Sequence, residues 1–176
     1  LDLVSHEKGV NIGMRHISLS TCGLIDGMDA LAKEDLQITL AVSLHAPDDE
    51  TRSALMPANR RCGVDELVSA CIRYFEKTGR RISFEYSMIN GVNDSPQQAE
   101  KLAKIALKIG AHINLIPLNH VEEREFAPSS KDNLRAFCRI LESKGANYTI
   151  RRKLGGDVDA FCGQLRRKRE KAKMRG

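Results

Sequence analysis

The sequence predicts an α/β fold of about five mostly parallel strands with helices packed outside them. Two observations predict this fold: short β-rich apolar runs alternate with amphipathic helical patterns, and no linker or low-complexity segment interrupts the chain. Such alternation is typical of parallel sheets, in which helices connect successive strands. The 176 residues are too few for an eight-stranded barrel of ~250 residues. Part of a (β/α) barrel and a doubly wound sheet both fit the pattern.

Five segments have the character of strands, and they lie at residues 16–20, 38–44, 82–88, 112–117 and 147–152. The second and fourth segments are almost continuously apolar. Strands that are covered on both faces have this composition. We therefore expect these two strands to be buried on both sides.

The clearest predicted helix follows the turn at residues 91–94. Ser95 is a suitable N-cap, Pro96 fits the first helical position and Gln98 completes a capping box. Gly110 predicts the end of this helix. Further helices are predicted over residues 28–33, 64–77 and 130–143, and after residues 155–156. The expected inward side chains of the two longer ones are Leu67, Val68, Cys71, Tyr74 and Phe75, and Leu134, Phe137, Cys138 and Leu141.

The charge of the chain is unevenly distributed. The net charge is +5, but residues 166–176 contain seven Lys or Arg and one Glu, so residues 1–165 have a net charge of −1. We therefore expect one domain over residues 1–165 and a flexible basic tail over residues 166–176. Such a tail either binds nucleic acid phosphates or is simply solvated. No apolar run approaches the ~20 residues of a membrane span, and we expect a cytoplasmic protein.

Ligands of parallel α/β folds bind at the carboxyl ends of the strands. The residues that follow the predicted strands include Ser20, Cys22, Ser43, His45, Met88, Asn90, Asn93, Asp94, Asn119, His120 and Cys162. Hydroxyl, amide and imidazole groups suit a polar organic ligand with ribose hydroxyls and an amino-acid group better than a metal ion. No zinc-binding or phosphate-loop motif is present. Each histidine is either a ligand-binding or acid–base group, or a loop residue bonded to the backbone.

The five cysteines are irregularly spaced and do not indicate a disulfide framework. Cys71 and Cys138 fall on the apolar stripes of predicted helices and are expected in the core. Cys162 lies between glycines at the end of a predicted strand, where a reactive thiol would be presented. Its neighbours Asp157 and Asp159 argue against simple activation as a thiolate.

Several motifs occur in one order along the chain: RHISLSTCG at 15–23, SLHAP at 43–47, GVND at 91–94, INLIPLN at 113–119 and DVDAFCGQL at 157–165. Together they resemble the carboxyl-terminal part of the dual-specificity RNA methyltransferases. These radical S-adenosylmethionine (SAM) enzymes methylate carbon 2 of an adenine in 23S ribosomal RNA and in transfer RNA. The resemblance implies that residues 1–165 form a fragment of a radical SAM (β/α)6 partial TIM barrel.

The resemblance also implies the roles of individual residues. The positions that match SAM-binding residues are Ser20, Ser43, Leu44, His45 and Asn119. Cys162 matches the catalytic cysteine, which is first methylated on sulfur. A radical on that methyl carbon then adds to the adenine, and a disulfide to Cys162 releases the product. The implied partners are 23S rRNA, tRNA and an electron donor for a [4Fe–4S] cluster.

The chain lacks several features of the family pattern. The C-x3-C-x2-C motif that holds the cluster is absent. In the family, the resolving cysteine, an acid–base Glu and a Gly-Glu pair also precede the matched part. We therefore expect no metal ligand in this chain, and we expect a truncated protein that is inactive alone.

Three alternatives remain open at this stage. The resistance methyltransferase that modifies carbon 8 of the same adenine shares most of these motifs. A non-catalytic RNA-binding domain could use Arg151, Arg152, Lys153 and the basic tail. A small hydrolase could use Ser43 and His45, although the chain has no G-x-S-x-G motif.

Overall fold

The computed structural model describes residues 2–118 and 126–151. Its elements are α1 (Asp2–Ser5), η1 (Met14–His16), β1 (Ser18–Thr21), α2 (Ile25–Leu31), β2 (Thr39–Ser43), α3 (Asp49–Leu55), η2 (Pro57–Arg60), α4 (Val64–Thr78), β3 (Ile82–Met88), α5 (Pro96–Ile109), β4 (His112–Pro117), α6 (Lys131–Ser143) and β5 (Tyr148–Ile150), where η denotes a 3-10 helix. The helix predicted after residues 155–156 lies outside the described residues.

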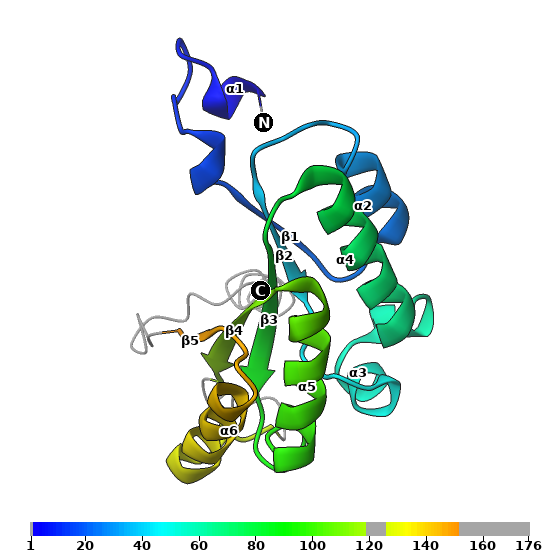
Figure 1. The fold of residues 1–176 in the computed structure, drawn as a ribbon, viewed down its shortest axis with the longest axis vertical. Coiled ribbons are helices and arrows are strands. Elements are labelled where there is room, and N and C mark those ends of the chain that lie inside the picture. Colours follow the sequence, from blue (N-terminus) through cyan, green and yellow to red (C-terminus); the bar gives the residue numbers. More distant parts are fainter. Residues whose placement is uncertain (1, 119–125, 152–176) are drawn as a thin grey trace, which may run out of the picture.

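The five strands form one parallel sheet in the order β1-β2-β3-β4-β5, which is their order in the chain. The five predicted strands are confirmed, and the bounds of β3 and β4 agree with the predicted ranges. Helices α2, α4, α5 and α6 lie on one side of this sheet (Figure 1). Strands with helices on a single side form part of a barrel wall rather than a doubly wound sheet.

The ends of the helices are set by local capping residues. Ser95 Oγ accepts a hydrogen bond from Gln98 N (3.2 Å) at the start of α5, and Gly110 ends it with φ +64°. Both features confirm the sequence prediction. Helix α3 was not predicted, although Asp48 Oδ1 caps it by accepting from Thr51 N (3.0 Å).

The hydrophobic core lies between the sheet and its helices. Alternate side chains of β3 are buried there, namely those of Ile82, Phe84, Tyr86 and Met88, and they meet residues of α4, α5 and α6 that include Leu67, Cys71, Tyr74, Leu102, Ala106, Phe137 and Leu141. Most of the predicted inward residues are therefore confirmed. Phe75 is an exception, because its side chain is 40% exposed at the margin of the α4 stripe.

The expected burial of the fourth strand on both faces is wrong. In β4, Ile113 and Leu115 are fully buried, but His112, Asn114 and Ile116 are only partly buried. Since helices cover one face of the sheet, the other face remains accessible in the described part of the chain. No helix among the described residues has the length and apolar character needed to cross a membrane.

Candidate functional site

The helix-free face of the sheet carries a row of polar side chains. Parallel register places Ser43, Glu85, Asn114 and Thr149 beside one another on β2, β3, β4 and β5. Side chains of residues paired in this way point to the same face. Ser20 lies on this face too, because its partner Ala41 is two residues before Ser43. The strands therefore build a polar surface where a barrel has its interior.

The segment that follows β2 is tightly attached to β3. Leu44 N and His45 N both donate to the carbonyl oxygen of Glu85, at 3.1 and 3.2 Å. His45 has φ +56°, an uncommon conformation for a residue other than glycine. Its Nδ1 accepts a hydrogen bond from Ser87 N (3.1 Å). The ring proton of the neutral imidazole is therefore on Nε2, and His45 can act as a donor there.

Burial lowers the pKa of His45 to about 4, with a further contribution from the nearby charge of Arg52. An unfolded chain protonates this histidine near pH 6.5, so folding favours the neutral form. The resulting stabilisation, about 3 kcal/mol, is present above pH 6.5 and is lost as the pH falls through 4. When the pH is lowered from 7 to 4, the unsubstituted chain should lose about 3 kcal/mol of this stabilisation, and the His45→Asn variant should not. Urea unfolding at both pH values measures the two free energies of unfolding.

The matched control for this prediction is His16→Asn, at an exposed histidine of η1. It should retain the pH dependence of the unsubstituted chain. Identical pH dependence in the His45→Asn variant would contradict a neutral, enclosed imidazole.

Arg52 of α3 is fully buried and joins the carboxyl ends of β1 and β2. Its guanidinium donates to the carbonyl oxygens of Cys22 (2.8 Å), Ser43 (3.2 Å), Leu44 (3.1 Å) and Cys62 (3.4 Å) and to Asn59 Oδ1 (2.7 Å). Burial lowers the pKa of Arg52, yet a guanidinium remains charged at any physiological pH. Arg52 therefore holds the Ser43–Leu44 backbone against the end of the neighbouring strand.

Asn93 provides the second attachment of this segment. Its amide donates to the carbonyl oxygens of His45 (2.7 Å) and Ser87 (2.6 Å) and accepts from Ile89 N (2.8 Å). The side chain is fully buried. The sequence placed Asn93 and Asp94 among the candidate ligand-binding residues, but the structure places both inside the protein.

Asp94 connects the same turn to α6. It accepts hydrogen bonds from Gly91 N (2.9 Å), Ser129 Oγ (2.5 Å) and Asn133 Nδ2 (2.9 Å). The GVND motif therefore serves to shape the turn and support the site rather than to contact a ligand.

The structure brings together three of the residues predicted to bind SAM. Ser20 is exposed, Ser43 and His45 are partly buried, and all three lie near the carboxyl ends of β1 and β2. The Leu44 side chain is instead fully buried in the hydrophobic core, so its contribution is to position the backbone. Asn119 and Cys162 lie outside the described residues, as do His120 and the basic segment 166–176.

The described cysteines are free. Cys71 and Cys138 are buried in the core as predicted, whereas Cys22 is exposed. Burial raises the pKa of the Cys71 thiol to about 12, which makes it a structural residue. Within the described ranges, no group of three or more His, Cys, Asp or Glu side chains could hold a metal ion.

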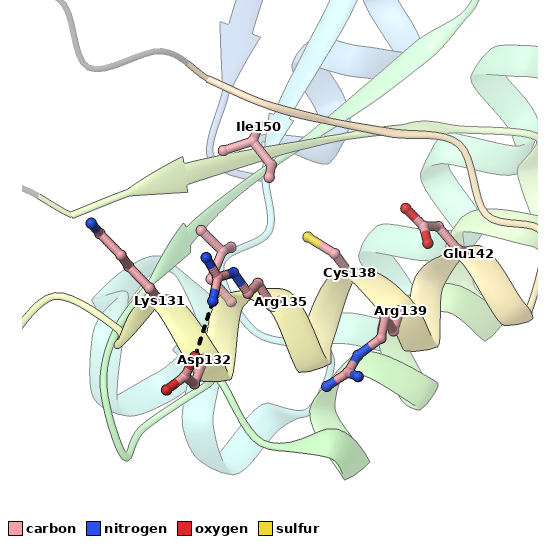
Figure 2. Close-up of a pocket in the computed structure, with 8 residues that line it drawn as sticks. Lys131, Asp132, Arg135, Cys138, Arg139, Glu142 and Ile150 are labelled. Carbon is pink, nitrogen blue, oxygen red and sulfur yellow. Dashed lines mark hydrogen bonds and ion pairs between the residues drawn. The ribbon is translucent and has the colours of Figure 1, made fainter.

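A separate open groove of about 760 Å³ lies between α6 and β5, and its lining residues are Lys131, Asp132, Leu134, Arg135, Cys138, Arg139, Glu142 and Ile150. Cys138 and Glu142 point from α6 toward the strand that carries Ile150 (Figure 2). None of the predicted site residues lines this groove. The polar helix-free face is therefore the better candidate site, and Glu85 and Arg52 are the members that sequence reasoning missed.

Comparison with curated proteins finds relatives over nearly the whole chain. Three of these relatives carry the name probable dual-specificity RNA methyltransferase RlmN. The protein from Desulforamulus reducens is 52% identical to this chain over 170 residues, that from Clostridium perfringens 46% over 173 residues and that from Bacillus subtilis 47% over 175 residues. These matches cover 97–99% of this chain. The chain spans about half the length of these relatives, 48–50% of each. No protein-family model matches it.

Solved structures share the same fold. A radical SAM methyltransferase from Sphaerobacter thermophilus superposes with a TM-score of 0.87 at 46% identity, over 92% of this chain and 47% of that chain. A domain of a pyruvate-formate lyase-activating enzyme from Bacteroides vulgatus has a TM-score of 0.60 at 16% identity, over 77% of this chain and 80% of that chain. The second likeness concerns the fold alone.

Proposed function

This chain belongs to the family of dual-specificity RNA methyltransferases named RlmN and matches about half of the length of each relative. We propose that it forms the matching part of an enzyme that methylates an RNA adenine at carbon 2. The cofactors of the complete enzyme are SAM and a [4Fe–4S] cluster, and its substrates are 23S rRNA and tRNA. The cluster ligands belong to the other half of the enzyme, because the C-x3-C-x2-C motif is absent from this chain.

The main support for this proposal is a set of polar groups on the helix-free face that have no partner among the described residues. Among the described residues, the hydroxyls of Ser20, Ser43 and Ser87 make no hydrogen bond. Hydroxyl groups that face an open barrel interior suit the hydroxyl and amino groups of a nucleoside. The residues present therefore fit SAM.

Each residue of the site has a distinct task in this proposal. Ser20 and Ser43 hold SAM through their hydroxyls, and neutral His45 holds it through an N–H donor. Bound SAM supplies the methyl group and the radical chemistry. Asn119 is proposed as a further SAM contact and Cys162 as the methyl carrier; for these two, the family resemblance is the support.

A hybrid protein tests the proposed function. We would replace the matched half of the D. reducens relative with this chain, express the hybrid with its cluster, and digest the RNA after incubation with SAM and a reductant. Mass spectrometry of the nucleosides should detect 2-methyladenosine. We expect Cys162→Ala to lower product formation more than ~100-fold, because the variant lacks the thiol proposed to carry the methyl group.

The matched control is Cys22→Ala, at an exposed cysteine, which should leave the product yield within about twofold. This chain without the other half should form no product. A hybrid that contains the cluster and binds SAM but methylates no RNA would contradict the proposed function. Detection of 8-methyladenosine would contradict the assignment of carbon 2.

A further inference from the structure

Glu85 occupies the centre of the helix-free face. Its register partners are Ser43 on β2 and Asn114 on β4. Its own carbonyl oxygen accepts the N–H groups of Leu44 and His45. The backbone of Glu85 is therefore fixed beside the proposed SAM-binding segment, and its carboxylate lies on the same face as the Ser43 hydroxyl.

One oxygen of this carboxylate is held by a chain of hydrogen bonds. Asn114 Nδ2 donates to Glu85 Oε1 (2.8 Å) and to Ser83 Oγ (3.0 Å). Asn114 Oδ1 in turn accepts from Thr149 Oγ1 (2.8 Å), which lies 3.1 Å from His112 Nε2. Three strands thus cooperate to orient one carboxylate, and Asn114 has no further hydrogen atom to offer a ligand.

The second oxygen, Oε2, has unused acceptor capacity. Its nearest charged partner is Arg151 Nη1 at 3.8 Å, which is beyond hydrogen-bond distance. The Glu85 side chain is only 14% exposed, whereas the Arg151 side chain is 70% exposed. Oε2 is not a buried unpaired atom and keeps access to solvent, and no described residue donates a hydrogen bond to it. A ligand donor can therefore replace water at this oxygen, and a charge-assisted hydrogen bond there is a strong one.

We propose that Glu85 is a further ligand-contacting residue of the SAM site, whose Oε2 accepts a hydrogen bond from a hydroxyl or amino group of the SAM adenosine. Asn114 is a positioning residue, because it acts by holding the carboxylate. This inference rests on the proposed function. It adds a negatively charged acceptor to the hydroxyls of Ser20 and Ser43.

The test measures SAM binding to the same hybrid protein without reductant, so that SAM is not consumed. Glu85→Gln keeps the shape of the side chain and can still accept from Asn114, but it presents an NH2 donor in place of Oε2. Loss of a charge-assisted hydrogen bond should raise the Kd for SAM by about 10- to 100-fold in calorimetric titration. The affinity for a tRNA transcript should stay within about twofold.

The matched control is Glu76→Gln, at an exposed glutamate of α4, which should leave the Kd for SAM unchanged. The unfolding midpoint without SAM reports any loss of structure, and Glu85→Gln should shift it by less than about 4 °C. Asn114→Ser is the second variant, and it should weaken SAM binding less than Glu85→Gln because the carboxylate remains.

Three results would overturn the inference in distinguishable ways. A SAM Kd unchanged by Glu85→Gln leaves the proposed function intact and removes Glu85 from the site. A loss of tRNA affinity with unchanged SAM affinity assigns Glu85 to the RNA instead. A hybrid that contains its cluster but does not bind SAM contradicts the proposed function and this inference together.

Discussion

Replacing Arg52 by Met is expected to lower the free energy of unfolding by about 3–5 kcal/mol. Methionine has a similar length but donates no hydrogen bonds, so several buried acceptors would lose their partner. The buried acceptors are the carbonyl oxygens of Leu44 and Cys62 and the side-chain oxygen of Asn59; those of Cys22 and Ser43 are part-buried. Each buried acceptor without a partner costs about 1–3 kcal/mol. Urea unfolding of the chain measures the loss.

Arg61→Met is the matched control, because Arg61 is exposed at the end of the neighbouring η2. It should change the stability by less than about 0.5 kcal/mol. Arg52→Lys should fall between the two, since a single ammonium cannot reach acceptors on three segments at once. A loss below about 1 kcal/mol for Arg52→Met would show that water replaces the guanidinium, and would contradict its structural role.

The Asn93→Asp variant is expected to lose about 3–5 kcal/mol at pH 7, although the two side chains have nearly the same shape. The introduced carboxylate would face the carbonyl oxygens of His45 and Ser87, which now accept from the amide. Burial and this repulsion would raise the pKa of the new carboxyl group in the folded state. The deficit should therefore shrink as the pH falls, because a protonated carboxyl group can donate one hydrogen bond.

Asn90→Asp is the control for this pH series, because Asn90 is exposed in the same turn. Its stability should follow that of the unsubstituted chain at every pH. Equal stability of Asn93→Asp and the parent at pH 7 would contradict the hydrogen bonds assigned to the amide.

Much of the fold is determined by local sequence patterns and can be predicted from them. The bounds of β3 and β4 were predicted from short apolar runs, and the start and end of α5 from Ser95, Pro96 and Gly110. The Ser43–His45 segment was placed at a strand end, where the structure has it. These features depend on neighbours in the chain, which a single sequence displays directly.

The interactions that hold the candidate site depend on residues far apart in the chain. Arg52 donates a hydrogen bond to the carbonyl oxygen of Cys22, 30 residues earlier in the chain. Asn93 donates to the carbonyl oxygen of His45, 48 residues earlier. A buried arginine also runs against the usual exposure of that residue type. Only the folded arrangement of β1, β2 and β3 brings these groups together.

Glu85 could have been found by its periodicity. Ser83, Glu85 and Ser87 alternate with Phe84 and Tyr86 in β3, and this period of two is typical of a strand with one polar face. The apolar members predict the face that packs on the core, and the polar members predict the face that remains open. The same alternation of His112 and Asn114 in β4 explains why that strand is covered on one face only.

The strand order has a consequence for how the chain folds during synthesis. Among the described strands, each one pairs with the strands directly before and after it in the sequence. The sheet can grow by one strand and one helix at a time as the polypeptide leaves the ribosome. Each pairing still joins residues that are 21 to 42 positions apart, because a parallel pair needs a crossover segment between its two strands. A new strand can therefore pair only after its own crossover segment has been synthesised. The direction of translation and the direction of sheet growth are therefore the same.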